Sequence, residues 1–253
     1  MKVCVLSSGS KGNCTYVETN NHKILIDIGT SCLYVEKSLK KINVLPQEID
    51  IILITHSHVD HIAGLKVFLK KYHPKVYLTP IIQEEIGIPI ENVEYIDNNI
   101  KIDTTLITAI KTSHDTKDSN GYIIEEDNSS VVYITDTGYI NEKFFKVLYN
   151  KTVYVFESNH DLELLMNNPH YPHHIKIRIM SDKGHLSNKD SAYYLSNFIG
   201  KNTKKVILAH LSEENNNPGL ALTNLQTTLQ KKNISFNDII IAQQNIQTEL
   251  YEI

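Results

Sequence analysis

The sequence predicts an α/β protein with two mixed β-sheets, on three observations. Short runs rich in β-branched residues alternate with amphipathic segments along the 253 residues. Residues 51–54 are apolar without interruption, as in a strand buried on both faces, whereas apolar residues recur at helical spacing in 62–71. No stretch rich in proline, glycine or serine divides the chain, so we expect a single domain, residues 1–253.

The first half of the chain supplies one sheet and begins the second. Strands are expected at residues 3–6, 15–17, 22–27, 51–54 and 75–78. Helices are expected at residues 32–43, after residue 60 and at 81–86, where apolar side chains follow helical spacing. Residues 93–96, 100–102 and 106–110 alternate or run apolar, and we expect them to form strands of the second sheet.

The second half continues that sheet. A hairpin is expected between residues 121–125 and 131–135, around a polar turn. Further strands are expected at 152–156 and 205–209, with a helix near 144–148. Ser187 and Asn188 resemble the N-cap and first residue of another helix.

Net charge, apolar stretches and cysteine count indicate which partners and which compartment to expect. The net charge of −4 leaves no overall basic footprint for nucleic acid, although a local basic groove remains compatible with it. Residues 1–9 are too short an apolar stretch for a signal peptide, and no segment has 18 consecutive apolar residues, so no membrane span is expected. Three cysteines cannot all pair, and reduced thiols are typical of the cytoplasm, where we expect the protein to act.

A cluster of metal-binding side chains follows the apolar run at 51–54. Residues 56–61 read His-x-His-x-Asp-His. His56 and His58 stand two apart on an extended segment, so their rings can point the same way and bind one ion. Asp60 and His61 lie where the backbone turns and can face a second ion. Two ions about 3.5–4 Å apart are the arrangement that many hydrolases use.

Other metal-binding residues recur at the ends of predicted strands. The full set at such ends is Asp27, His56, His114, Asp136 and His210. His114 is the natural third imidazole for the first ion. The two oxygens of Asp136 suit a carboxylate that bridges two ions. Asp27 can orient a ligand histidine through a hydrogen bond without binding an ion itself.

The order of these residues resembles the metallo-β-lactamase superfamily of hydrolases. The resemblance covers nearly the whole chain and implies an αβ/βα four-layer sandwich, with two mixed sheets face to face and helices outside. It also implies a ligand set: His56, His58 and His114 for the first ion, and Asp60, His61 and His210 for the second, with Asp136 and a water or hydroxide between them. Mixed imidazole and carboxylate ligands suit two Zn²⁺ or Mn²⁺ ions, with iron as a third candidate.

Three further stretches narrow the resemblance. Residues 7–13 read Ser-Ser-Gly-Ser-Lys-Gly-Asn, residues 157–161 Glu-Ser-Asn-His-Asp, and residues 183–188 Lys-Gly-His-Leu-Ser-Asn. Together they resemble the YycJ/WalJ family, relatives of RNase J-type nucleases that lack the inserted β-CASP domain. This resemblance implies a 5′-to-3′ DNA exonuclease that uses a metal-bridging hydroxide, with DNA favoured over RNA as the partner.

Such a reaction needs an acid to protonate the leaving oxygen. His185 is the first candidate, because it precedes a helix start at which a phosphate could rest, and His160 is the second. Asp60 is expected to take part in catalysis as well as in metal binding. Lys176 and Arg178 could line a groove that follows the nucleic-acid backbone. Substrate contacts are expected from polar residues of the family-like stretches: Ser8, Asn13, Asn159, Lys183, Ser187 and Asn188.

Two other function classes stay open at this point. A small-molecule hydrolase of the glyoxalase II type, acting on thioesters or cyclic phosphodiesters, would turn over such esters and show no salt-dependent DNA binding. A non-catalytic regulatory protein that has kept the fold would have no need of all seven ligands. The sequence leaves the oligomeric state undecided.

Overall fold

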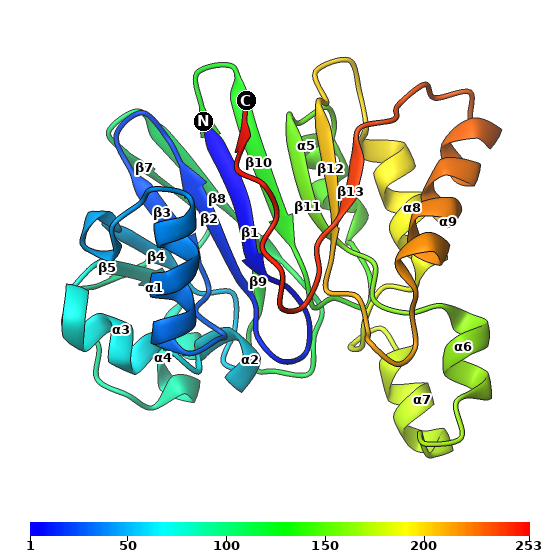
Figure 1. Cartoon of the computed structure of the whole chain (residues 1–253), viewed down its shortest axis with the longest axis horizontal. Helices are drawn as coiled ribbons and strands as arrows, with labels where there is room; N and C mark the ends of the chain where they lie inside the picture. The colour runs from blue at the N-terminus through cyan, green and yellow to red at the C-terminus, as the bar shows by residue number, and fades with distance from the viewer.

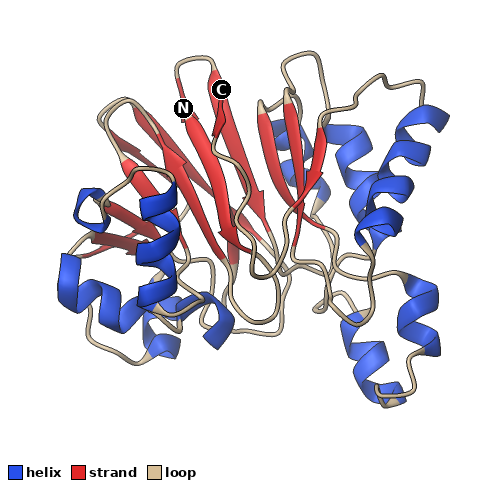
Figure 2. Ribbon diagram, in the orientation of Figure 1, coloured by secondary structure: helices blue, strands red, loops and turns tan.

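Side chains alternate along strand β1 (Lys2–Ser7) between two hydrophobic cores. Val3 and Val5 belong to one core and Cys4 and Leu6 to the other, as expected of a strand covered on both faces. The computed structural model describes residues 1–253 and extends this pattern to the whole molecule. Two sheets lie together in the middle and helices cover their outer faces (Figure 1, Figure 2). The predicted four-layer α/β sandwich is confirmed.

The first sheet has seven strands in the order β14-β1-β2-β3-β4-β5-β6. Its other strands are β2 (Cys14–Glu18), β3 (Lys23–Ile26), β4 (Ile51–Leu53), β5 (Lys75–Leu78), β6 (Val93–Tyr95) and β14 (Tyr251–Glu252). Pairing is antiparallel from β14 to β3 and parallel from β3 to β6. The outer face packs against three helices: α1 (Cys32–Lys41), α3 (Leu65–Tyr72) and α4 (Pro80–Ile86). A 3₁₀ turn, η1 (Pro46–Glu48), leads into β4.

The second sheet also has seven strands, in the order β13-β12-β11-β10-β9-β8-β7. Their bounds are β7 (Asn99–Ile102), β8 (Thr105–Lys111), β9 (Asn120–Glu126), β10 (Ser129–Ile134), β11 (Val153–Glu157), β12 (Lys205–Ala209) and β13 (Ile239–Ile241). Pairing is antiparallel from β7 to β10 and parallel from β10 to β13. Its outer face carries η2 (Glu142–Phe144), α5 (Phe145–Leu148), α8 (Asn188–Phe198) and α9 (Pro218–Lys231).

Two sequence predictions differ from the structure. The strand expected at residues 93–96 is β6, and it lies in the first sheet rather than the second. It follows β5 and α4 as a crossover unit, which adds a parallel strand to the same sheet. The helix expected after residue 60 is broken into α2 (Val59–Ile62) and α3, because the Gly64 N–H donates to the carbonyl of Ile28 at 2.9 Å instead of to Asp60.

Several elements had no counterpart in the prediction. They are α6 (Leu162–Asn167), α7 (His173–Ile179), α9, β13 and β14. Helices α6 and α7 project beyond one edge of the sheets (Figure 1). After β13 the chain crosses to the first sheet, where Glu252 pairs with Lys2 and the two chain ends lie side by side (Figure 1). No helix in the structure has the length and apolar character that a bilayer span requires.

Strand direction decides where the functional residues gather. In the first sheet β1, β3 and β4 run the same way, and in the second sheet β8, β10, β11 and β12 do so. The carboxyl ends of each set therefore meet at one edge of their sheet, where open α/β sheets usually bind ligands.

Candidate metal centre

Every predicted ligand stands beyond the end of a strand at this edge. His56 follows β4, and the chain then enters α2, whose first turn contains Asp60 and His61. His58 is the residue that precedes this helix. The ligands from the second sheet follow β8, β10 and β12 and are His114, Asp136 and His210.

The structure brings the seven predicted ligands into adjoining groups. Donor atoms within each group lie no more than 4.8 Å apart. The groups that correspond to the two ions are His56, His58 and His114, and Asp60, His61 and His210. Asp136 forms a further group with His56, which belongs to the first ion's group, and His61, which belongs to the second ion's group. A carboxylate in this place is suited to contact both ions.

Hydrogen bonds to the Nδ1 atoms of His61 and His114 fix which nitrogen of each of these two rings faces the centre. The His61 Nδ1 donates to Asp27 Oδ2 at 2.7 Å, and Asp27 also accepts from the backbone and hydroxyl of Thr55, each at 2.8 Å. The His114 Nδ1 donates to the carbonyl of Gly184 at 3.2 Å. Each of these two rings therefore turns its Nε2 towards the centre, the usual effect of such outer partners, and in His61 the Asn13 amide lies 3.0 Å from that nitrogen.

Glu157 is a central residue that the sequence analysis did not assign. It ends β11, is fully buried, and accepts from His210 Nδ1 at 3.0 Å and His185 Nδ1 at 2.8 Å. It also accepts from the backbone N–H groups of residues 136, 137 and 186. Burial works to raise the pKa of Glu157, but the two histidines outweigh it and lower the pKa to about 2. Its position at a strand end was the available signal.

The spacing of these donors fits divalent cations. Neighbouring nitrogen and oxygen atoms around His61 and His210 lie 3.1–3.9 Å apart. Two donors that each stand about 2.1 Å from one tetrahedral ion lie about 3.4 Å apart. The Nε2 atoms of His56 and His210 and the Oδ2 atom of Asp136 are buried without a hydrogen-bond partner. Buried polar atoms of this kind are costly unless a ligand satisfies them.

The electrostatic field at the centre also favours cations. Burial by itself lowers the pKa of His210, but Asp136 and the other carboxylates around it raise the pKa to about 10. The pKa of His61 is likewise held well above its usual value, against the effect of burial, by Asp136 and Asp27. Surroundings that stabilise positive charge on two buried imidazoles would also stabilise a metal ion.

The centre opens into a cleft of about 260 Å³. Ligands from both groups line it, together with Asp115, His185, Lys183 and residues of α7. His160 does not line it: this side chain is buried, and both ring nitrogens lack a hydrogen-bond partner. Burial lowers the pKa of His160 to about 4. Of the two candidate acids, only His185 reaches the cleft.

Five of the six residues predicted to contact substrate are buried and take part in internal hydrogen bonds. Of these six residues, only Lys183 lines the cleft. The Ser8 hydroxyl accepts from the His210 N–H at 2.7 Å, and the Asn159 amide donates to the His210 carbonyl at 3.0 Å. The others with such internal hydrogen bonds are Asn13, Ser187 and Asn188. Lys176 also lies outside the cleft lining and donates to the carbonyl of Met166.

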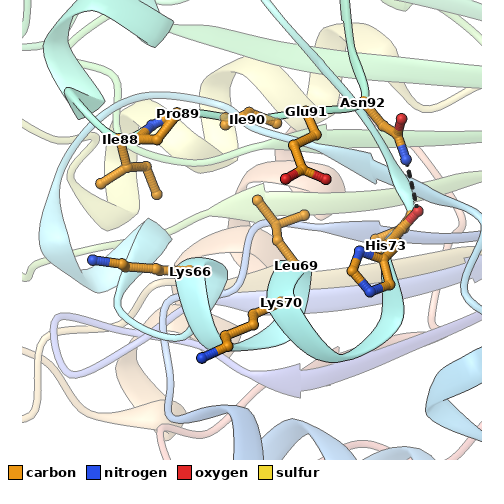
Figure 3. Close-up of a pocket in the computed structure, with 10 residues that line it drawn as sticks. Lys66, Leu69, Lys70, His73, Ile88, Pro89, Ile90, Glu91 and Asn92 are labelled. Carbon is orange, nitrogen blue, oxygen red and sulfur yellow. Dashed lines mark hydrogen bonds between the residues drawn. The ribbon is translucent and has the colours of Figure 1, made fainter.

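A second pocket lies between α3 and residues 88–92 (Figure 3). It measures about 220 Å³, and Lys66, Lys70 and Glu91 are among its lining residues. Asn92 donates to the carbonyl of His73 at its rim, at 3.1 Å. It holds no group of metal-binding side chains.

Residues 8–183 match the family model described as the Metallo-beta-lactamase superfamily. The chain belongs to this superfamily. The match includes every predicted ligand except His210. It confirms the predicted resemblance and assigns the chain to a superfamily of metal-dependent hydrolases.

Two superfamily relatives and one solved structure are similar over most of the chain. Exodeoxyribonuclease WalJ of Streptococcus pneumoniae is 37% identical, over 87% of this chain and 85% of the relative. Exodeoxyribonuclease YycJ of Bacillus anthracis is 36% identical, over 90% of this chain and 89% of the relative. The metallo-beta-lactamase fold protein YhfI of Bacillus subtilis has a TM-score of 0.73 with 16% identity, covering 98% of each chain, and shows the same fold.

Proposed function

We propose that this protein is a binuclear metal-dependent exonuclease that hydrolyses DNA from its 5′ end. The observation that carries the proposal is the pair of adjoining donor groups with Asp136 between them. Two ions held so close together are suited to displacement at phosphorus. The names of the two curated relatives support DNA as the substrate. Three buried, unpaired cysteines support action in a reducing compartment such as the cytoplasm.

The residues around the cleft divide the tasks of such a site. His56, His58 and His114 would hold one ion, and Asp60, His61 and His210 the other. When bound, two Zn²⁺ or Mn²⁺ ions would lower the pKa of a shared water and offset the charge of the phosphoryl group. Asp60 lines the cleft and would also orient the attacking water.

His185 is the proposed proton donor to the leaving oxygen. Its ring lines the cleft, and its Nδ1 donates to the buried carboxylate of Glu157. This bond leaves Nε2 for the leaving group. The buried carboxylate behind the ring holds its orientation towards the cleft, where a general acid must reach the leaving oxygen.

The α7 side of the cleft is suited to a polyanion. Helix α7 carries Lys176, which lies outside the cleft lining, and Arg178, which lines the cleft and is ion-paired with Asp115. His173 and His174 on the same helix are exposed, and Lys183 follows it along the cleft wall. Few cationic charges are involved, so we expect modest DNA affinity that weakens as salt rises.

The test is the digestion of end-labelled single- and double-stranded DNA by metal-stripped protein reloaded with Mn²⁺ or Zn²⁺. Stepwise loss of nucleotides is expected, and a block at the 5′ end should stop it while a block at the 3′ end should not. His58→Ala should lower the rate by more than about a hundred-fold, since even changes to the partners of metal ligands cost 10–100-fold. His170→Ala, an exposed histidine away from the cleft, serves as the matched control.

Other outcomes would contradict the proposal. Equal digestion by the wild type and His58→Ala would indicate a contaminating nuclease. Turnover of a thioester or a cyclic phosphodiester, without DNA cleavage, would favour the small-molecule hydrolase. Absence of hydrolysis with either metal would favour the regulatory protein.

A further inference from the structure

Helix α7 turns one apolar face towards the metal cleft. Thirteen residues line this cleft, and the two hydrophobic ones are Ile175 and Ile179 of this helix. They stand four positions apart, so their side chains lie one above the other on the same face of α7. The third isoleucine of the helix, Ile177, is 50% exposed and is not part of the cleft wall.

The two cleft-lining isoleucines do not support the body of the molecule. Each side chain is partly buried, but neither belongs to one of the three hydrophobic cores or packs against them. The helix that carries them projects beyond the edge of the sheets (Figure 1). Apolar side chains that line a cleft in this way are the usual contact surface for the apolar part of a ligand.

The apolar wall begins beside the proposed proton donor. The carbonyl of Ile179 accepts from the backbone N–H of His185 at 2.9 Å, which joins this end of α7 to the loop that carries the donor. Ile175 lies one helical turn, about 5.4 Å, further from that loop. Between them in the sequence, Arg178 forms an ion pair with Asp115 on the opposite side of the cleft. The wall is therefore held in place next to the position of a reacting phosphate.

The two kinds of surface in the cleft match the two kinds of surface of a nucleotide. The metal-binding groups, His185 and Lys183 suit the phosphate. The faces of a base carry no charge and gain free energy when they leave water for an apolar surface. Isoleucine has no hydrogen-bonding group in its side chain, so contact with a base face would not distinguish one base from another.

We propose that Ile175 and Ile179 form a subsite for one base next to the scissile phosphate, and that this subsite holds the base without reading its identity. The inference rests on the proposed DNA exonuclease activity and names the part of the substrate that α7 binds. The contact acts on binding in the ground state and the transition state alike, so its loss raises KM and leaves kcat nearly unchanged.

Cleavage of strands that lack a single base tests the subsite. In a series of single strands, the base is removed from one position at a time, counted from the 5′ end. The wild type should show a KM about ten-fold higher when one particular position is abasic, the lower end of what a missing apolar group costs in an apolar pocket. The double variant with Ile175→Ala and Ile179→Ala should have a similarly raised KM on the intact strand and should not respond to the missing base.

The matched control is Ile177→Ala, which makes the same change on the same helix outside the cleft and should behave as the wild type does. Alanine favours a helix more than isoleucine does, so the double variant should keep α7 folded. Leucine at positions 175 and 179 restores the apolar surface and should restore the KM. The loss in the double alanine variant should also stay constant as salt rises, because an apolar contact releases no counterions.

Each arm has an outcome that contradicts the subsite. A wild type that cleaves intact and abasic strands alike would overturn this inference and leave the proposed function standing, whereas a wild type that cleaves no DNA would overturn both. An equal loss in Ile177→Ala would assign the effect to the helix rather than to the cleft wall. A loss that shrinks as salt rises would assign it to displaced charges.

Discussion

Three residues of the metal centre adopt a backbone conformation that residues with a β-carbon usually avoid. The φ angles of Asp27, Asp136 and His210 are 61°, 56° and 55°. This left-handed region costs of the order of 1 kcal/mol for each such residue, and Asp and His enter it more readily than most. Each stands just past a strand, so the turn directs its side chain back into the centre. The sequence locates these residues at strand ends but does not reveal the turn.

Single residues also set the limit of what the sequence could predict. The seven metal-binding side chains were recognisable because imidazole and carboxylate groups recur in a known order. Glu157 was not, because its importance comes from contacts with His185 and His210, which stand 28 and 53 positions away.

The buried ring of His160 should make the protein less stable in mild acid. Its pKa is lowered from 6.5 to about 4 by burial, so the unfolded chain takes up a proton at a higher pH than the folded one. His160 therefore does not lower the free energy of unfolding above pH 6.5, but this free energy falls as the pH drops from 6.5 to about 4. The loss reaches about 3 kcal/mol, at 1.36 kcal/mol per pKa unit.

Urea unfolding at several pH values measures this loss. His160→Leu has no ring to protonate, so the free energy of unfolding of the wild type should fall more steeply than that of the variant between pH 6.5 and 4. Both proteins are compared with a chelator present, so that ion loss does not contribute. Parallel curves for the two proteins would contradict the prediction.

At the scale of elements, strand existence was predictable and sheet membership was not. The apolar run at 93–96 has the same pattern in either sheet, and the preceding helix α4 decides that β6 extends the first. Helix α7 escaped prediction because its isoleucines stand at 175, 177 and 179, a two-residue spacing that is not helical. In the structure Ile175 and Ile179, four apart, are the pair that lines the cleft.

The packing of α7 against the loop that holds His185 should be sensitive to one methyl group. A β-carbon on Gly184 would lie 2.1 Å from the Ile179 carbonyl oxygen and 2.4 Å from that of Arg178. Gly184→Ala must therefore push the end of α7 away from the cleft. We expect a loss of about 1–3 kcal/mol in stability, the usual cost of overpacking, and a slower rate of DNA cleavage.

Thermal unfolding and initial cleavage rates measure the two effects. Gly219→Ala is the matched control, because a β-carbon there meets only the Asn217 side chain, at 3.1 Å. If Gly184→Ala has the melting temperature and the cleavage rate of the wild type, the position of α7 does not depend on this contact.

At the scale of the whole molecule, the metal centre joins the two sheets. The segment after β4 in the first sheet supplies four of the seven proposed ligands, and the ends of strands in the second sheet supply the other three. Bound ions would therefore connect the two halves of the sandwich. The sequence predicted this arrangement only in outline, because strand ends indicate an edge but not how two sheets face each other.

Removal of the ions should accordingly lower the melting temperature. Each ion present at a hundred times its dissociation constant stabilises the folded state by about 2.7 kcal/mol, so two contribute about 5 kcal/mol. For a chain of this size that corresponds to roughly 10–20 °C. Differential scanning calorimetry with Mn²⁺ or with a chelator measures the shift. Asp136→Asn should lose most of it, and an equal shift in wild type and variant would place the stabilising ions elsewhere.

The pairing of Lys2 with Glu252 has a practical consequence. Both chain ends lie at the edge of the first sheet where β1 begins, and the metal centre lies at the edge where β1 ends (Figure 1). A molecule anchored to a glass surface through either terminus would therefore present its cleft to the solution. Single tethered molecules could then be observed by their fluorescence while each one shortens a labelled DNA strand.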